Sequence, residues 1–173
     1  MPRRLCAVGG AGATGSRLVT GTTTEHELLE VELAEFVGAD SGLVFSSGYT
    51  ANLGAVTALS GPGSLIVSDA GSHASLVDAC RLSRARVAVA PHSDVGFLAD
   101  TLRSRVEERA LVVTDSVFSA DGDLAPLRQM HQVCREYGGR SCWSTRRMAS
   151  VCAVPVDVDS STSRAWPVNP TSS

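Results

Sequence analysis

The sequence contains no lysine, and all fifteen of its basic residues are arginine. A reaction that needs a lysine amine, such as the formation of a covalent imine with a carbonyl compound, cannot run on this chain alone. The arginines do not gather into a basic run, and the formal net charge is −3. We therefore expect neither nucleic acid nor an anionic membrane surface among its partners.

Patterns that mark a metal centre or a membrane span are also missing. The cysteines contain no Cys-x-x-Cys pair and no zinc-ligand spacing, so we interpret them as buried thiols and predict no metal site. No apolar run reaches the length of a transmembrane helix, and the first residues show no signal-peptide pattern. These absences predict a cytoplasmic protein. The cysteines are Cys6, Cys80, Cys134, Cys142 and Cys152.

The hydrophobic content is 43% over 173 residues, enough for one domain with a buried core. From residue 42 onward, short apolar runs rich in Val, Leu and Ile alternate with helical runs, as in sheets that are covered on both faces. This alternation predicts an α/β fold with a mainly parallel sheet and flanking helices. The predicted strands are Leu43–Phe45, Ser64–Ser68, Arg86–Ala90 and Leu111–Thr114, and the predicted helices are Tyr49–Leu59, Ala74–Leu82, Val95–Glu107 and Leu124–Tyr137.

An amphipathic helix is predicted before the first of these strands, over Glu25–Val37. Its leucines recur at helical spacing between glutamates. Thr24 is a suitable N-cap with Glu27 as its capping-box partner, and Gly38 is a suitable stop.

The stretch from Val44 to Asn52 joins a predicted strand to a predicted helix through Ser-Ser-Gly. The first backbone N–H groups of a helix are unpaired and point outward from its N-terminus. Small residues at this position let a phosphate approach these N–H groups closely. An ordinary strand-to-helix turn would show the same residues. On this stretch alone both interpretations stay open.

Ligands of parallel sheets bind at the carboxyl ends of the strands. Three segments should meet at this rim: Ser46–Tyr49, Asp69–His73 and Asp115–Ser119. His73 could stack on a planar ring there, and hydroxyls such as that of Ser119 could hydrogen-bond a cofactor oxygen. The alternatives are a capping histidine and ordinary turn chemistry around Asp121.

Gly10–Gly15 fits the dinucleotide-binding pattern G-x-G-x-x-G. A dinucleotide site also needs a helix that opens at the third glycine and an acidic residue at the end of the next strand. Ser16–Thr24 holds four threonines and a further glycine, which is poor helix sequence, and the acidic residues that follow fall within a predicted helix. A dinucleotide-binding oxidoreductase is therefore the remote alternative.

Five segments taken together resemble the α-oxoamine synthases, pyridoxal 5'-phosphate enzymes with the aspartate-aminotransferase type of fold. They occur in the order typical of that family, which makes the resemblance specific. The segments are Gly15–Gly21, His26–Glu30, Phe45–Asn52, Ser72–Ser75 and Thr114–Gly122.

The resemblance implies a large-domain fold of the fold-type-I class and a set of cofactor-binding residues. Ser47, Gly48 and Tyr49 would meet the cofactor and its phosphate, in agreement with the helix-terminus argument. By the same resemblance His73 would stack on the pyridine ring, and Ser119 would hydrogen-bond the phenolic oxygen of the cofactor.

The family condenses an amino acid with an acyl thioester and releases CO₂, with the cofactor as electron sink. For the member that the segments match best, the substrates are L-alanine and pimeloyl-CoA or pimeloyl-carrier protein. The resemblance also implies a homodimer. A sister enzyme, such as glycine C-acetyltransferase, shares most of the segments and is the alternative.

The resemblance covers residues 12–139, which we expect to be part of the large domain, whereas residues 1–11 form an unmatched stub. The family's Asp-Glu-Ala-His-Gly motif and Schiff-base lysine are absent, so we predict no catalytic residue and an inactive chain. Residues 140–173 are rich in Ser, Thr, Arg and Pro, and we expect them to be disordered. Read one base out of frame, Ser141–Val154 can encode Leu-Leu-Val-Asp-Glu-Ala-His-Gly-Leu-Gly-Val-Arg-Gly. The codon of Met148 is only ATG, and a preceding C gives the histidine codon CAT. We therefore interpret this fragment as a frameshifted product with an out-of-frame tail.

Overall fold

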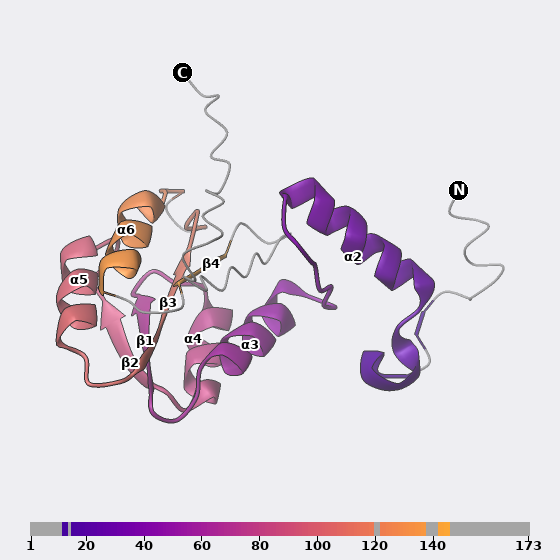
Figure 1. Cartoon of the computed structure of the whole chain (residues 1–173), viewed down its shortest axis with the longest axis horizontal. Helices are drawn as coiled ribbons and strands as arrows, with labels where there is room; N and C mark the ends of the chain where they lie inside the picture. The colour runs from indigo at the N-terminus through magenta and orange to yellow at the C-terminus, as the bar shows by residue number, and fades with distance from the viewer. Residues whose placement is uncertain (1–11, 14, 120–121, 138–141, 146–173) are drawn as a thin grey trace, which may run out of the picture. The chain divides into compact units, whose positions relative to one another are not determined.

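The computed structural model describes residues 12–13, 15–119, 122–137 and 142–145, the last four by their backbone (Figure 1). The chain divides into two compact units, Met1–Ser46 and Ser47–Ser173. The second unit holds the sheet and all five predicted cofactor-binding residues. None of the described helices is long and apolar enough to cross a membrane.

The described part of the second unit contains a four-stranded sheet with the order β2-β1-β3-β4. Its central strand β1 pairs on both sides, so that Ile66 lies opposite Val87 on one neighbour and Leu111 on the other. All three pairings are parallel, which confirms the predicted fold class. The strands are β1 (Ser64–Asp69), β2 (Arg86–Ala90), β3 (Arg109–Asp115) and β4 (Cys142–Thr145).

Helices cover both faces of this sheet, with α3 and α4 on one side and α5 and α6 on the other (Figure 1). Alternation along β1 explains the two cores: Ile66 packs in the cluster of Leu76, and its neighbours Leu65 and Val67 pack in the cluster of Leu98. The helices are α3 (Gly48–Leu59), α4 (Ala74–Ser83), α5 (Val95–Ser104) and α6 (Leu127–Tyr137).

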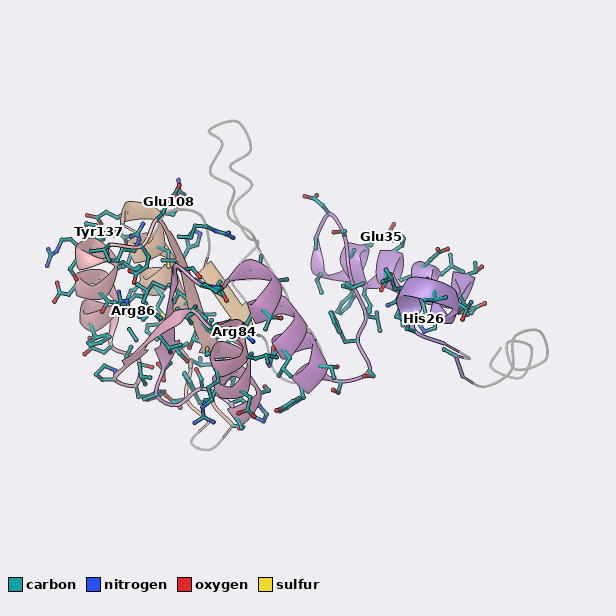
Figure 2. All side chains as sticks on the ribbon, turned by 90° about the horizontal axis from the view of Figure 1, so that it is seen from below. His26, Glu35, Arg84, Arg86, Glu108 and Tyr137 are labelled. Atoms are coloured by element: carbon teal, nitrogen blue, oxygen red, sulfur yellow. The ribbon has the colours of Figure 1, made fainter. Side chains whose placement is uncertain are left out.

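The first unit contains the short turn η1 (Arg17–Gly21) and the helix α2 (Thr24–Val37). The cap of α2 lies one residue earlier than predicted. Thr23 is the N-cap, and its capping-box partner is His26, which Figure 2 labels in the first turn. Gly38 ends the helix in the left-handed conformation with φ 71°, as predicted.

No strand forms over Leu43–Phe45 in the described structure, so this prediction was wrong. Side chains satisfy the backbone there: the N–H of Val44 donates to Glu30 Oε1 at 2.7 Å, and the carbonyl of Val44 accepts from Arg17 Nη1 at 2.8 Å. Glu30 Oε1 and Arg17 Nη1 also form an ion pair with each other, at 2.6 Å. An apolar run alone does not reveal that its hydrogen-bonding partners are side chains.

Two helix boundaries also differ from the prediction. α5 ends at Ser104 rather than Glu107, because Arg105 is extended and its guanidinium caps the carbonyl of Leu102 at 2.7 Å. α6 begins at Leu127 rather than Leu124. Pro126 disfavours a helical conformation in the residue before it, and Leu124 instead bridges to Val117.

β4 lies within the segment 140–173 that we expected to lack regular structure. Its four residues pair in parallel with Val112–Asp115, whose backbone groups offer an edge to a further strand. The remainder, 146–173, lies outside the described residues, as do the whole stub 1–11 and part of the Gly10–Gly15 pattern. The described residues after that pattern form η1 rather than an α-helix that opens at Gly15.

Candidate functional site

The carboxyl ends of β1, β2 and β3 form one rim, at Asp69, Ala90 and Asp115. α3 runs into β1 through a four-residue turn, so its other end, the N-terminus, returns to the carboxyl end of the strand. α4 begins shortly after β1 ends, and its N-terminus lies at the same rim. Two helix N-termini and three strand ends therefore converge there, which is the usual place for a ligand site in an open parallel α/β sheet.

The first turn of α3 presents unpaired backbone donors. Ser47 is the N-cap: its Oγ accepts from the N–H of Thr50 at 3.2 Å, and its own N–H donates to Thr50 Oγ1 at 3.2 Å. Within the described part of the chain, the N–H groups of Gly48 and Tyr49 donate to no acceptor. Together with the helix dipole, these two donors suit a phosphate group.

The side chain of Tyr49 links α3 to α4. Its hydroxyl donates to Asp78 Oδ2 at 2.7 Å, and this hydrogen bond to a carboxylate raises the pKa of Tyr49. Tyr49 as a whole is 44% exposed. The phenol is therefore used to hold the two helices together, and the backbone N–H is the part of Tyr49 that remains open.

His73 is the N-cap of α4 and the centre of a hydrogen-bonded chain. Its Nδ1 accepts from the N–H of Ser75 at 3.2 Å and lies 2.8 Å from Ser75 Oγ. Asn52 Nδ2 on α3 donates to the same hydroxyl at 2.8 Å. The backbone N–H of His73 donates to Asp115 Oδ2 at 2.7 Å, which ties the cap to the end of β3. Ser75 thus orients the imidazole, and Asp115 holds the backbone that carries it.

Ser119 lies on the loop that follows β3, and its side chain is exposed. The loop is closed by backbone hydrogen bonds: Phe118 N–H donates to the carbonyl of Asp123 at 3.0 Å, and Gly122 N–H donates to that of Phe118 at 2.8 Å. Among the described contacts, Ser119 makes none with the other four predicted residues. The structure therefore connects Tyr49 and His73 through α4 and brings Ser119 to the same rim without a direct bond to them.

These groups fit pyridoxal 5'-phosphate in their chemistry. The open donors of α3 match a phosphate, an oriented imidazole offers a flat face to a ring, and the exposed Ser119 hydroxyl can donate to a phenolic oxygen. The buried Asn52 Oδ1 has no hydrogen-bond partner in the described structure and is a further acceptor beside this network. No cluster of three or more metal-ligating side chains occurs among the residues described.

Sequence reasoning missed the supporting contacts of the site. Asp78 and the Asn52–Ser75 pair carry no pattern of their own, because a helix surface residue and a capping serine are common in any fold. Asp69, His92 and Asp123 form a second cluster on the rim, described below. Asp69 ends β1 and His92 follows β2 by two residues, and those positions were the available signal, whereas Asp123 lies further along the loop after β3.

Comparison with known proteins identifies relatives that match most of this chain. A sequence model described as aminotransferase class I and II matches residues 2–141. The 8-amino-7-oxononanoate synthase of Mycolicibacterium gilvum (strain PYR-GCK) is 76% identical over 129 residues, which are 75% of this chain and 34% of the relative. The 8-amino-7-oxononanoate synthase 1 of Mycobacterium tuberculosis (strain ATCC 25618 / H37Rv) is 74% identical over the same share of this chain and 33% of its own length. The chain thus spans about a third of these relatives.

Solved structures show the same fold. A serine palmitoyltransferase from S. paucimobilis, with a bound PLP–myriocin aldimine, matches with a TM-score of 0.76 and 35% identity over 83% of this chain and 37% of its own. An 8-amino-7-oxononanoate synthase from Francisella tularensis matches with a TM-score of 0.66 and 24% identity over 82% of this chain and 38% of its own. The second likeness concerns the fold alone.

Proposed function

Because the chain belongs to the aminotransferase class I and II family, we propose that it is part of an 8-amino-7-oxononanoate synthase and that its rim binds pyridoxal 5'-phosphate. The identity of 74–76% to curated synthases carries the assignment. The open first turn of α3, which faces the same rim as His73 and Ser119, supports the cofactor site.

The roles of the residues follow from their positions. The N–H groups of Gly48 and Tyr49 bind the phosphate, and Ser47 keeps the first turn of α3 in place by capping it. His73, held by Ser75 and Asp115, presents its ring to the pyridine ring. The hydroxyl of Ser119 donates a hydrogen bond to the phenolic oxygen of the cofactor. Pyridoxal phosphate, when bound, supplies the electron sink for a carbanion.

The proposed substrates of the whole enzyme are L-alanine and pimeloyl-CoA or pimeloyl-carrier protein, in biotin biosynthesis. A sister enzyme such as glycine C-acetyltransferase remains the alternative, since the rim groups bind the cofactor rather than the acyl chain. The likeness to a serine palmitoyltransferase at 35% identity shows that enzymes with other substrates share this fold. The homodimer and the cytoplasmic location remain predictions from the sequence.

We propose that this chain by itself does not catalyse the reaction. It has no lysine, and the family chemistry needs one to hold the cofactor covalently. Its segment from Ser141 to Val154 can encode the missing family motif when read one base out of frame, and this possibility supports the proposal of a frameshifted tail. The backbone of Cys142–Thr145 lies beside β3. In the proposed shifted frame this segment would encode Leu-Val-Asp, just before Glu-Ala-His.

Equilibrium dialysis against pyridoxal phosphate tests the site. The wild-type chain should retain the cofactor without a covalent bond, and His73→Ala and Ser119→Ala should each weaken retention by about tenfold, as the loss of one good contact implies. His131→Ala is the matched control, because His131 is an exposed histidine of α6 away from the rim. Equal retention by all four proteins, or none by the wild type, would reject the site.

A further inference from the structure

A histidine outside the proposed cofactor contacts joins two loops of the rim. His92 follows β2, and its Nδ1 lies 2.8 Å from Asp69 Oδ1 at the end of β1. Its Nε2 lies 2.6 Å from Asp123 Oδ2, on the loop that carries Ser119. The ring also packs edge-on against Phe118 of that loop, with the ring centroids 4.3 Å apart.

The two partners require protons on both ring nitrogens. An ionised carboxylate only accepts hydrogen bonds, so a ring that faces two carboxylates donates from both nitrogens and carries a positive charge. Consistent with this, the hydrogen bonds that the ring donates to Asp69 and, to a lesser extent, to Asp123 raise the pKa of His92 to about 9. The charged groups that face the ring are these two carboxylates, one from β1 and one from the loop after β3.

The two anchors of this contact differ in rigidity. The Asp69 side chain is 4% exposed, and its carboxylate also accepts from the N–H groups of Gly71 and Ser93 at 2.7 Å each. The Asp123 side chain is 41% exposed. Asp69 therefore fixes the ring, and the ring in turn holds the more exposed loop.

We propose that His92 is a positioning residue, a doubly donating imidazolium that clamps the described part of the Ser119 loop, residues 116–119 and 122–125, to the end of β1. The clamp acts through the loop and does not touch the proposed cofactor position. Its effect on cofactor binding rests on the proposed function, whereas its effect on the loop does not. The clamp gives a role to the charged cluster of Asp69, His92 and Asp123, which lies on the rim but is separate from the His73–Asp115 hydrogen bond.

Amide hydrogen exchange of the full chain tests the clamp without any cofactor. The reporters are the loop amides of Phe118, Gly122 and Ala125, which donate to backbone carbonyls within the loop. His92→Gln should lower their protection by about tenfold, as expected for the loss of a charged hydrogen bond. The control His131→Gln should leave it unchanged. Unchanged protection in His92→Gln, or an equal loss in the control, overturns the proposal.

A second variant separates loop release from global unfolding. Asp123→Ala leaves the His92–Asp69 pair intact, so the loop amides should lose protection while the amides of Gly71 and Ser93 keep theirs. A uniform loss over the whole chain overturns the proposal. An NMR titration of the wild-type ring should give a midpoint near 9, and one near 6.5 overturns it as well.

Cofactor affinity then separates the clamp from the proposed function. If the wild type binds pyridoxal phosphate, His92→Gln should weaken that binding by about tenfold. Full wild-type affinity in the variant would contradict the positioning role. A wild type that binds no pyridoxal phosphate refutes the proposed site. The exchange measurements still decide the clamp in that case.

Discussion

The backbone N–H of His73 donates a hydrogen bond of 2.7 Å to Oδ2 of Asp115, 42 residues further along the chain. The bond connects the N-cap of α4 to the last residue of β3. It explains how a solvent-exposed histidine at the start of a helix has a fixed position on the rim. A carboxylate acceptor also suits the positive end of the α4 dipole.

Asp115→Ala should therefore destabilise the chain by about 1 kcal/mol and weaken cofactor retention, because the cap loses a charged acceptor. Urea unfolding measures the first effect. Asp100→Ala is the control: Asp100 is an exposed α5 residue paired with Arg103, and its loss should cost about 0.5 kcal/mol or less. Equal losses in both variants would show that the His73–Asp115 bond contributes nothing specific.

Ser47→Ala should cost about 1 kcal/mol of stability, since α3 loses its N-cap and its capping box. The orientation of the first turn should loosen, so phosphate affinity should fall as well. Ser41→Ala, an exposed serine in the first unit, should change neither property. A stable Ser47→Ala protein with wild-type unfolding in urea would contradict the capping role.

The pH dependence of stability should contain a contribution from His92. Its folded pKa of about 9 is above the ordinary value of 6.5, so its contribution is complete below pH 6.5 and is lost as the pH rises to about 9. The difference in unfolding midpoint between wild type and His92→Gln should shrink over that range. Urea unfolding at pH 6, 7.5 and 9 measures it, and a difference that grows with pH would contradict the assigned charge.

Gly71→Ala should disturb the same cluster. A Cβ at Gly71 would lie 2.9 Å from His92 Nδ1 and 3.2 Å from Asp69 Oδ1, and the ring has no room to retreat while both nitrogens are bonded. The pKa of His92 should fall in this variant, as an NMR titration can measure. Gly61→Ala is the matched control, because its Cβ would meet nothing within 4 Å. An unshifted titration in Gly71→Ala would argue against a tight clamp.

The sheet was predictable because its signal is local. β1 and β3 are apolar runs buried on both faces, and the predicted Ser64–Ser68 and Leu111–Thr114 lie within the observed strands. Leu43–Phe45 carried a similar signal and was wrong, because Glu30 and Arg17 take its backbone hydrogen bonds. Side chains from distant positions cannot be assigned to a backbone from composition.

The position of the candidate residues on the rim was predictable, but the contacts that hold them were not. The strand-end rule placed Ser47, His73 and Ser119 at one rim, since parallel strands bring their carboxyl ends together. The bonds that hold them depend on three-dimensional proximity across tens of residues. His92, for example, meets Asp69 and Asp123 at separations of 23 and 31 residues, and the spacing of these three residues matches no motif.

The nucleotide sequence across codons 136–156, read again from genomic DNA, tests the central claim most directly. The claim is that this chain derives from a synthase gene whose reading frame changes before Ser141. It predicts that the shifted codons over Ser141–Val154 spell Asp-Glu-Ala-His-Gly, with CAT formed from the last base of Arg147 and the first two of Met148. Codons that spell another sequence in that frame would contradict the claim.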